Sequence, residues 1–240
     1  MNSYDHITTK HYAAYRPPLH ELILEKCITK NDGFVSGLDI GCGTGQSSIS
    51  LSKYCKKVIG IEPSPDMLKG SIPHPEVEYQ DYDGRILNFP DQLFDIITLA
   101  GSLYYGKSQK LLDEIVRVGK DSSIILVYDF EILLHNIYKE LQIDRFLKNN
   151  TYNHVEDFSG LDQRKIKLLS RFQDQLVIKI DPPDLAHLLL SMEEIHMIIV
   201  KEHGLSDPFW KLCEILDKLS GGNLFELVAK LYYTKYLSIG

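Results

Sequence analysis

The chain has 240 residues, of which 44% are hydrophobic and 25% are charged, as is typical of a globular protein that buries an α/β core. These values exclude a disordered, collagen-like or membrane-type composition. The net charge of -7 argues against a polyanion-binding protein, because phosphate contacts require a clustered face of lysine and arginine, so we expect no nucleic-acid partner.

Residues 17–130 alternate between helical and strand patterns. The spacing of apolar residues predicts helices at residues 17–28, 44–55, 64–71 and 108–120, and strands at residues 36–41, 57–63, 76–82, 93–103 and 122–130. We expect Ile49 and Leu51 to point inward and Ser64 to cap the third helix. This alternation predicts βαβ units with right-handed crossovers and a doubly wound, mostly parallel sheet.

The pattern changes in the second half of the chain. Helical and polar segments between about residues 131 and 174 form an insertion in which we expect substrate specificity to lie. A strand is then expected at residues 175–180, helices at residues 182–204 and 207–222, and a final strand at residues 227–239. We expect residues 1–240 to form a single domain.

Location and redox state are also predicted from simple patterns. Four cysteines are scattered without a CxxC pair or a metal-ligand spacing, and five histidines (His135, His154, His187, His196 and His203) are interpreted as surface or helix residues. The first eighteen residues lack the apolar region of a signal peptide, and no apolar run reaches the about 18 residues of a membrane span. We therefore expect a cytoplasmic protein without a metal or a membrane contact.

The stretch LDIGCGTG places three glycines directly after an apolar strand. Gly41, Gly43 and Gly45 allow a sharp turn and leave no Cβ atoms to keep a ligand away. Backbone N–H groups and the positive end of the following helix favour a polar or anionic group, so an adenosine-like ligand is expected. The dinucleotide fingerprint requires its third glycine where Gln46 stands, which argues against the alternative of a nicotinamide-dependent oxidoreductase.

The segment DIGCGTG resembles the first motif of class I S-adenosylmethionine-dependent methyltransferases. The resemblance implies that Asp39 supports the loop and the methionine end of the cofactor. It also implies that the glycines pack against the sulfonium and the ribose. The remaining cofactor contacts implied for this loop come from Cys42 and Thr44.

Two further segments resemble the motifs that follow in this family. VIGIEPSPDML matches the second motif, where Glu62 would accept both ribose hydroxyls, because a carboxylate has lone pairs for two donors. VEYQDYDG matches the third, where Asp81 would hold the adenine amino group beside Tyr82, although Asp83 competes for that role. The other cofactor positions that the resemblance implies are Pro63, Met67 and Ala100.

The resemblance extends over nearly the whole chain. HYAAYRPP is similar to the N-terminal lid of small-molecule methyltransferases of the trans-aconitate-methyltransferase-like, or type 11, group, so residues 1–18 would form a lid with Tyr12 and Arg16 near the cofactor. PDLAHLLLSM and LYYTKYLSI resemble the C-terminal helix and last strand of that group. The implied fold is a Rossmann-like α/β fold with a seven-stranded sheet, an antiparallel last strand and a helical insertion after strand five.

The implied reaction is methyl transfer from S-adenosyl-L-methionine to a small-molecule substrate, with S-adenosyl-L-homocysteine as product. Where the group commonly has a His-Trp pair after strand four, this chain has Tyr104 and Tyr105, which are the candidate catalytic residues and could face a sulfonium with their rings. A general base is needed only for a poor nucleophile such as an alcohol, and none is identified.

Several alternatives stay open at this point. One is a non-catalytic S-adenosylmethionine-binding subunit, and another is a methyltransferase that acts on a protein. DPPD at residues 181–184 resembles the tetrad of amino-methylating nucleic-acid enzymes, but that tetrad follows strand four, where this chain has LAGS. The acceptor and the oligomeric state are not determined by the sequence.

Overall fold

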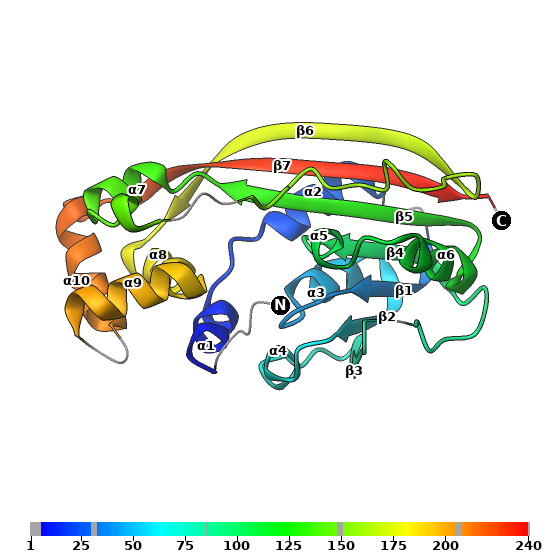
Figure 1. Ribbon diagram of the computed structural model, residues 1–240, viewed down its shortest axis with the longest axis horizontal. Coiled ribbons are helices and arrows are strands. Elements are labelled where there is room, and N and C mark those ends of the chain that lie inside the picture. The colour runs from blue at the N-terminus through cyan, green and yellow to red at the C-terminus, as the bar shows by residue number, and fades with distance from the viewer. Residues whose placement is uncertain (1–5, 30–32, 85, 148–150, 205–207, 240) are drawn as a thin grey trace. The chain divides into compact units, whose positions relative to one another are not determined.

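A computed structural model describes residues 6–29, 33–84, 86–147, 151–204 and 208–239 (Figure 1). Contacts between Cα atoms divide the chain into two compact units. We call them the sheet unit (Pro18–Phe130, Tyr152–Asp174 and Leu231–Gly240) and the helical unit (Met1–Pro17, Glu131–Thr151 and Gln175–Lys230). Each unit is described by itself.

The central element is a seven-stranded sheet with the order β3-β2-β1-β4-β5-β7-β6. The strands are β1 (Phe34–Ile40), β2 (Cys55–Glu62), β3 (Val77–Asp81), β4 (Phe94–Ala100), β5 (Gly119–Ile132), β6 (Ile166–Ile180) and β7 (Phe225–Ser238). Strands β3, β2, β1, β4 and β5 are parallel, whereas β5, β7 and β6 pair antiparallel. The predicted α/β fold with an antiparallel last strand is therefore confirmed.

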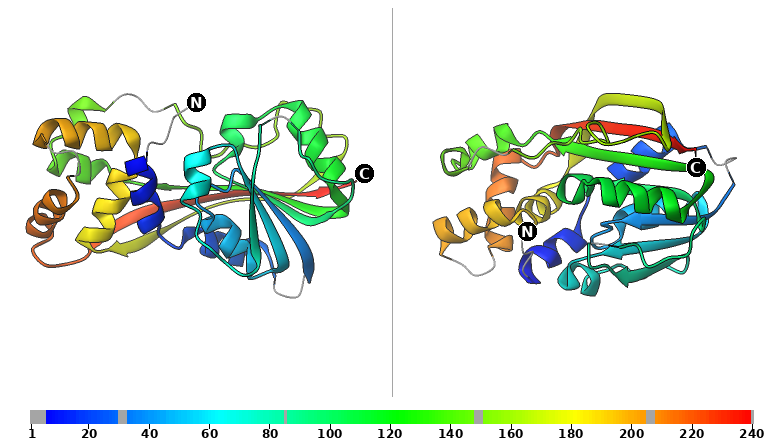
Figure 2. Two further views of the ribbon diagram at one scale, coloured as in Figure 1. Left: turned by 90° about the horizontal axis from the view of Figure 1, so that it is seen from below. Right: turned by 45° about the vertical axis from the view of Figure 1, so that its right-hand side comes forward.

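Four of the described helices of the sheet unit lie where the sequence predicts them, whereas α5 (Leu103–Gly106) was not predicted, because the strand expected at residues 93–103 ends at Ala100. The helices are α2 (Leu19–Cys27), α3 (Gln46–Ser52), α4 (Pro65–Lys69), α5 (Leu103–Gly106) and α6 (Gln109–Val118). Ser64 accepts a hydrogen bond from the Met67 N–H at 3.4 Å, as expected of a cap. Leu51 is fully buried, but Ile49 is only half-buried. Within this unit the helices flank both faces of the sheet (Figure 2), as doubly wound folds require.

The core of the sheet unit is built on its interior strands. Leu38 of β1, Ile97 of β4 and Ile125 of β5 are all completely buried. Strands covered on both faces are apolar nearly throughout, which explains the continuous apolar run of β4 in the sequence. Full burial of each such side chain contributes about 1.5–3 kcal/mol to folding. This core fixes the ends of the parallel strands, where the candidate site lies.

Elements in the second half of the chain also differ from the sequence prediction. Strand β6 begins at Ile166 rather than at residue 175. Its residues 170–179 alternate between half-buried and exposed positions and include many polar side chains, so the first part of the strand has no apolar pattern in the sequence. Strand β6 is also the last strand in the sheet order, and edge strands are commonly polar. The expected helix at residues 182–204 is two helices, since Met192 has an extended backbone (ψ 113°) between them.

The helical unit contains α1 (His6–Ala14), α7 (His135–Glu140), α8 (Pro182–Leu190), α9 (Glu193–His203) and α10 (Phe209–Ser220). Leucines of α8 and α10 form much of its buried core. The DPPD sequence begins α8: Asp181 accepts a hydrogen bond from the Asp184 N–H at 2.8 Å, and Pro182 occupies the first turn. Over the described ranges, no helix combines the length and apolar character needed to cross a bilayer.

Candidate functional site

The glycine loop that follows β1 is held by backbone hydrogen bonds. The N–H groups of Gly41 and Cys42 both donate to the Ile61 carbonyl of β2, at 2.8 and 3.1 Å. Gly41 has φ +74°, and a Cβ atom there would lie 2.4 Å from the Cβ of Ser102, just after β4. The loop therefore packs against its neighbours so closely that this position requires glycine.

A second glycine of the loop is equally constrained. Gly45 has φ +94°, and a Cβ atom there would lie 2.1 Å from the hydroxyl oxygen of Tyr79 on β3. That hydroxyl donates to the Ile72 carbonyl at 2.9 Å, while the Ile72 N–H donates to the Thr44 carbonyl at 3.0 Å. Ile72, which follows α4, and the side chain of Tyr79 thus support the glycine loop.

Asp39, next to the last residue of β1, supports the loop through buried hydrogen bonds. Its side chain is completely buried and accepts hydrogen bonds from the hydroxyls of Ser47 (2.5 Å), Ser48 (2.7 Å) and Thr98 (2.7 Å). Burial raises the pKa of Asp39, and the three hydroxyl donors oppose that rise. The geometry gives this carboxylate a supporting role, because it joins β1, α3 and β4 through one buried side chain.

Glu62, the last residue of β2, bridges the loop and the segment that begins α4. Its Oε2 accepts the Gly43 N–H at 3.0 Å, and its Oε1 accepts the Ser64 N–H at 2.9 Å. The residue is 9% exposed, and burial raises its pKa while the two backbone donors oppose the rise. Each carboxylate oxygen has a second lone pair, so further donors can be accepted.

A hollow of about 450 Å³ lies beside the end of β3. Asp81 lines it, is exposed, and stands directly opposite Glu62 in the register of β2 and β3. Tyr82 also lines the hollow, is half-buried and packs against the core. Asp83 shares this hollow, so the choice between the two aspartates stays open.

One wall of this hollow is shaped by residues that the sequence did not single out. The guanidinium of Arg117 on α6 donates to the carbonyls of Leu87 (2.7 Å) and Phe89 (2.8 Å). Glu114 accepts the Leu87 N–H at 3.0 Å, and its hydrogen bond from Arg117 lowers its pKa. The signal in the sequence was weak, because an i,i+3 Glu-Arg pair is common on solvated helix faces.

The remaining predicted positions of the sheet unit lie around the loop. Cys42 and Met67 are almost completely buried, and burial raises the pKa of the Cys42 thiol, which keeps it neutral. Thr44 is fully buried, and its hydroxyl has no hydrogen-bond partner within the described part of the chain. Pro63 follows Glu62 and is half-buried, and Ala100 ends β4 opposite Tyr128 of β5.

Tyr104 and Tyr105 lie on α5 and contact a third tyrosine, Tyr152. The centroid of the Tyr152 ring is 4.6 Å from that of Tyr104 and 5.7 Å from that of Tyr105. Tyr104 is 37% exposed and Tyr105 is 66% exposed, so both rings are open to a ligand. Tyr152 comes from the predicted insertion and was not singled out in the sequence.

Tyr12 and Arg16 belong to the helical unit. The Arg16 guanidinium carbon lies 3.6 Å from the centroid of the Tyr12 ring, which is a cation–π contact. The resemblance implies that both residues lie near the cofactor, and this position stays a prediction. Residues 1–5 of the expected lid lie outside the described residues.

His154, in the inserted segment, pairs with a carboxylate and is not free on the surface. Its Nδ1 lies 2.9 Å from Oδ2 of Asp129 on β5, and its side chain is half-buried. No sequence motif marks this pair, because 24 intervening residues separate the two partners. Among the residues that the structure covers, no group of three or more His, Cys, Asp or Glu side chains is placed to hold a metal ion.

The chain is similar to known methyltransferases in sequence. Residues 38–127 match the model of a methyltransferase domain family. A protein named as a methyltransferase from Dictyostelium discoideum is 28% identical over 129 residues, which cover 52% of this chain and 48% of that protein. The chain spans about half the length of the first curated relatives it matches.

Two solved structures share the fold. One is a protein described as a type II methyltransferase from Anaeromyxobacter dehalogenans, with a TM-score of 0.64 and 16% sequence identity. The matched region covers 94% of this chain and 98% of that protein. A Haemonchus contortus phosphoethanolamine N-methyltransferase, solved with S-adenosylhomocysteine, has a TM-score of 0.53 at 17% identity and covers 97% of this chain and 58% of its own. At these identities the likeness concerns the fold alone.

The close packing behind the loop predicts that Gly45→Ala destabilises the protein more than Gly160→Ala. Both glycines have positive φ, so both variants incur about 1–2 kcal/mol of backbone strain. Only the Cβ at position 45 collides with Tyr79, whereas nothing lies within 4 Å of a Cβ at position 160. Urea denaturation measures both free energies of unfolding, and equal losses would contradict the packing described.

The hydroxyl cluster predicts that Asp39→Ala lowers the free energy of unfolding by about 2–4 kcal/mol, because three buried hydroxyls lose their shared acceptor. Asp39→Asn should cost less, since the amide oxygen still accepts and the serine hydroxyls can accept from its NH₂ group. Urea denaturation of both variants tests this order, and a reversed order excludes the role assigned to the carboxylate.

Proposed function

We propose that this chain, which carries a methyltransferase domain of the S-adenosylmethionine-dependent class in residues 38–127, transfers a methyl group from S-adenosylmethionine to a small molecule. The observation that carries this proposal is the placement of Glu62. Its carboxylate joins the glycine loop to the start of α4 and stands opposite Asp81 in the next strand. This site lies at the carboxyl ends of parallel strands, where doubly wound sheets bind ligands.

The residues present fit the cofactor. Glu62 accepts the two ribose hydroxyls with the lone pairs that its backbone donors leave unused. The hollow beside β3 takes the adenine, where Asp81 accepts the amino group and Tyr82 flanks the ring. The glycine loop lets the backbone approach the nucleoside, and Asp39 keeps that loop in place from beneath.

The loop and neighbouring segments complete the proposed cofactor site. The glycines Gly41 and Gly43 face the sulfonium and ribose. Cys42, Thr44, Pro63, Met67 and Ala100 line the rest of the site. When bound, the cofactor supplies a methyl carbon activated by a sulfonium leaving group. Tyr12 and Arg16 are proposed to cover this site as part of the lid.

The acceptor is proposed to be a small molecule. The acidic net charge disfavours a polyanion, and the exposed rings of Tyr104 and Tyr105 offer aromatic surface to an acceptor. These two tyrosines orient the acceptor in line with the methyl group and present their electron-rich ring faces to positive charge. Correct orientation is the main contribution of the protein to such a displacement.

We also propose a cytoplasmic location. All four cysteines are free thiols, and three of them (Cys27, Cys42 and Cys55) are buried. Free cysteines are typical of a reducing compartment. Burial raises the pKa of Cys27 and Cys55 to about 12, so these thiols stay neutral at physiological pH.

The cofactor site predicts that S-adenosylhomocysteine raises the melting temperature, and that Glu62→Gln weakens its binding about 10- to 100-fold, since hydrogen bonds to a charged acceptor are worth about 1.5–3 kcal/mol. Glu78→Gln is the matched control, because Glu78 is an exposed glutamate on β3 that pairs with Lys57. Thermal shift and calorimetry measure both variants.

Two outcomes count against this site. NAD should give no shift, and a shift with NAD alone would support an oxidoreductase instead. Equal weakening by both glutamate variants would remove Glu62 from the site. The melting temperature of unliganded Glu62→Gln must also be measured, because its amide NH₂ would face a backbone N–H.

The raised pKa of Glu62 predicts how the affinity depends on pH. The ribose hydroxyls donate to the ionised carboxylate, so protonation of Glu62 weakens binding. Affinity for S-adenosylhomocysteine should therefore fall as the pH falls through this raised pKa, at a higher pH than for an exposed glutamate. Calorimetry from about pH 7 down to about pH 4.5, near the ordinary glutamate pKa, measures the fall, and a constant affinity over this range contradicts it.

A further inference from the structure

The sheet unit contains a histidine–carboxylate pair that the cofactor site does not use. Asp129 Oδ2 lies 2.9 Å from His154 Nδ1, and Asp129 Oδ1 accepts a hydrogen bond from the Phe130 N–H at 2.7 Å. Both oxygens of the carboxylate therefore have a partner. An ionised carboxylate only accepts hydrogen bonds, so Nδ1 must carry the proton. In the neutral ring, Nε2 then has a bare lone pair.

This pair lies at the same edge of the sheet as the glycine loop. A Cβ atom at Gly101 would lie 3.1 Å from Asp129 Oδ1, and Gly101 directly follows β4. Its neighbour Ser102 donates to the Ile40 carbonyl at 2.5 Å and packs against Gly41. A short series of contacts thus connects the His154–Asp129 pair with the loop proposed to hold the methyl donor.

The side chain of His154 lines a small cavity of about 30 Å³. Tyr104, Tyr152 and Tyr232 are also part of its wall. The ring centroid of Tyr152 is 4.7 Å from that of His154 and meets it edge-on, and the Tyr232 ring stacks at 6.3 Å. This space admits one or two water-sized groups, which is enough for the reactive end of an acceptor but not for a whole metabolite.

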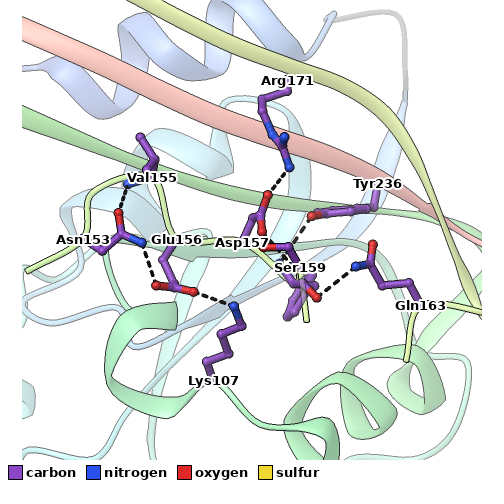
Figure 3. Close-up of polar contacts among 10 residues, drawn as sticks. Lys107, Asn153, Val155, Glu156, Asp157, Ser159, Gln163, Arg171 and Tyr236 are labelled. Atoms are coloured by element: carbon purple, nitrogen blue, oxygen red, sulfur yellow. Dashed lines mark hydrogen bonds and ion pairs between the residues drawn. The ribbon is translucent and has the colours of Figure 1, made fainter. Parts of the chain in front are cut away.

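The segment that carries His154 is fixed on both sides, and Figure 3 shows the ion pairs of Glu156 and Asp157 on its C-terminal side. Lys107, which follows α5, forms an ion pair with Glu156 at 2.6 Å, and this hydrogen bond lowers the pKa of Glu156. Arg171 of β6 forms an ion pair with Asp157. On the N-terminal side of His154, the Tyr152 hydroxyl donates to the Gly101 carbonyl at 2.7 Å. These contacts hold the imidazole at a defined place.

The charges around the imidazole favour a neutral acceptor. Lys107 and Arg171 are each neutralised by an acidic neighbour of the same segment, which leaves the carboxylate of Asp129 beside His154. The charged and titratable groups that line the cavity with His154 are Tyr128 and Asp129 of β5, Glu156, Arg171 (β6), Tyr104 (α5), Tyr152, and Tyr232 and Tyr233 of β7. Glu156 is paired with Lys107, and Arg171 is paired with Asp157. A carboxylate acceptor would meet uncompensated negative charge here, whereas a hydroxyl would not.

We propose that His154 is the general base of the methyl transfer and that the acceptor is an aromatic hydroxyl, an inference that rests on the function proposed above. Nε2 of His154 takes the hydroxyl proton while the acceptor oxygen forms its bond to the methyl carbon. The carbon–sulfur bond breaks, and its electron pair neutralises the sulfonium. Asp129 is a positioning residue that fixes the tautomer and stabilises the imidazolium, which later releases its proton to water.

The aromatic class of the acceptor follows from the mouth of the cavity. Tyr104 lines the cavity, and its ring meets the exposed ring of Tyr105 edge-on, with 5.5 Å between the two centroids. Such rings pack well against a flat aromatic body, while the hydroxyl enters toward His154.

The tautomer of His154 tests the first part of the proposal without any turnover. A two-bond ¹H–¹⁵N correlation spectrum of the unliganded protein should show His154 with a protonated Nδ1 and an unprotonated Nε2. Asp129→Asn should abolish this preference, because an amide NH₂ can donate to Nδ1. A protonated Nε2 in the neutral ring of the unsubstituted protein would overturn the proposed base.

Activity tests the second part. With radiolabelled methyl donor, the protein should methylate a pool of small phenols and leave a matched pool of benzoates unmodified. His154→Gln and Asp129→Asn should lower the rate about 10²- to 10⁴-fold, as expected for loss of a general base. His135→Gln, at an exposed histidine of α7, is the matched control and should keep the full rate. Added imidazole should restore part of the activity of His154→Gly.

The failure of this inference is distinguishable from failure of the proposed function. If S-adenosylhomocysteine gives no thermal shift with the unsubstituted protein, the proposed cofactor is wrong. If the shift is present and unchanged in His154→Gln, the cofactor site is intact and the activity decides. Full activity of His154→Gln, preferential methylation of the benzoates, or methylation of neither pool then overturns the proposal.

Discussion

The buried carboxylate of Asp39 is the interaction on which the rest of the candidate site depends. It accepts three hydroxyl hydrogen bonds and so joins the end of β1 to α3 and β4. Burial of a charge is costly unless it is well hydrogen-bonded, and here three hydroxyls donate to the carboxylate. The sharp turn of the glycine loop begins directly above this anchor, with Gly41 packed against Ser102.

The strands on either side of β1 each contribute one part of the candidate site. Glu62 fixes the middle of the loop through Gly43, and the register of β2 and β3 places Asp81 directly opposite it. On the other side of β1, Ser102 and Gly101 connect the loop to β5, where Asp129 orients His154. Carboxyl ends of neighbouring parallel strands thereby bring together a proposed nucleoside site and a proposed acceptor site.

The sequence suggested most residues of the proposed nucleoside site and few residues of the proposed acceptor site. Asp39, Glu62 and Asp81 were picked out by the resemblance of their segments to the motifs of class I methyltransferases, and they lie at or next to the ends of β1, β2 and β3. Arg117 and His154 were missed because their roles come from partners distant in the sequence, Leu87 and Asp129. A single sequence shows the spacing of residues along the chain but not these pairings in space.

The sequence by itself determined the alternation of strands and helices, the α/β class and the position of the glycine turn, because these follow from local periodicity and from the conformational freedom of glycine. Only the tertiary structure decided the full length of β6, the break between α8 and α9, and the pairing of His154 with Asp129. A polar edge strand and a long-range hydrogen bond leave no periodic signal, since both depend on which segments the folded sheet brings side by side.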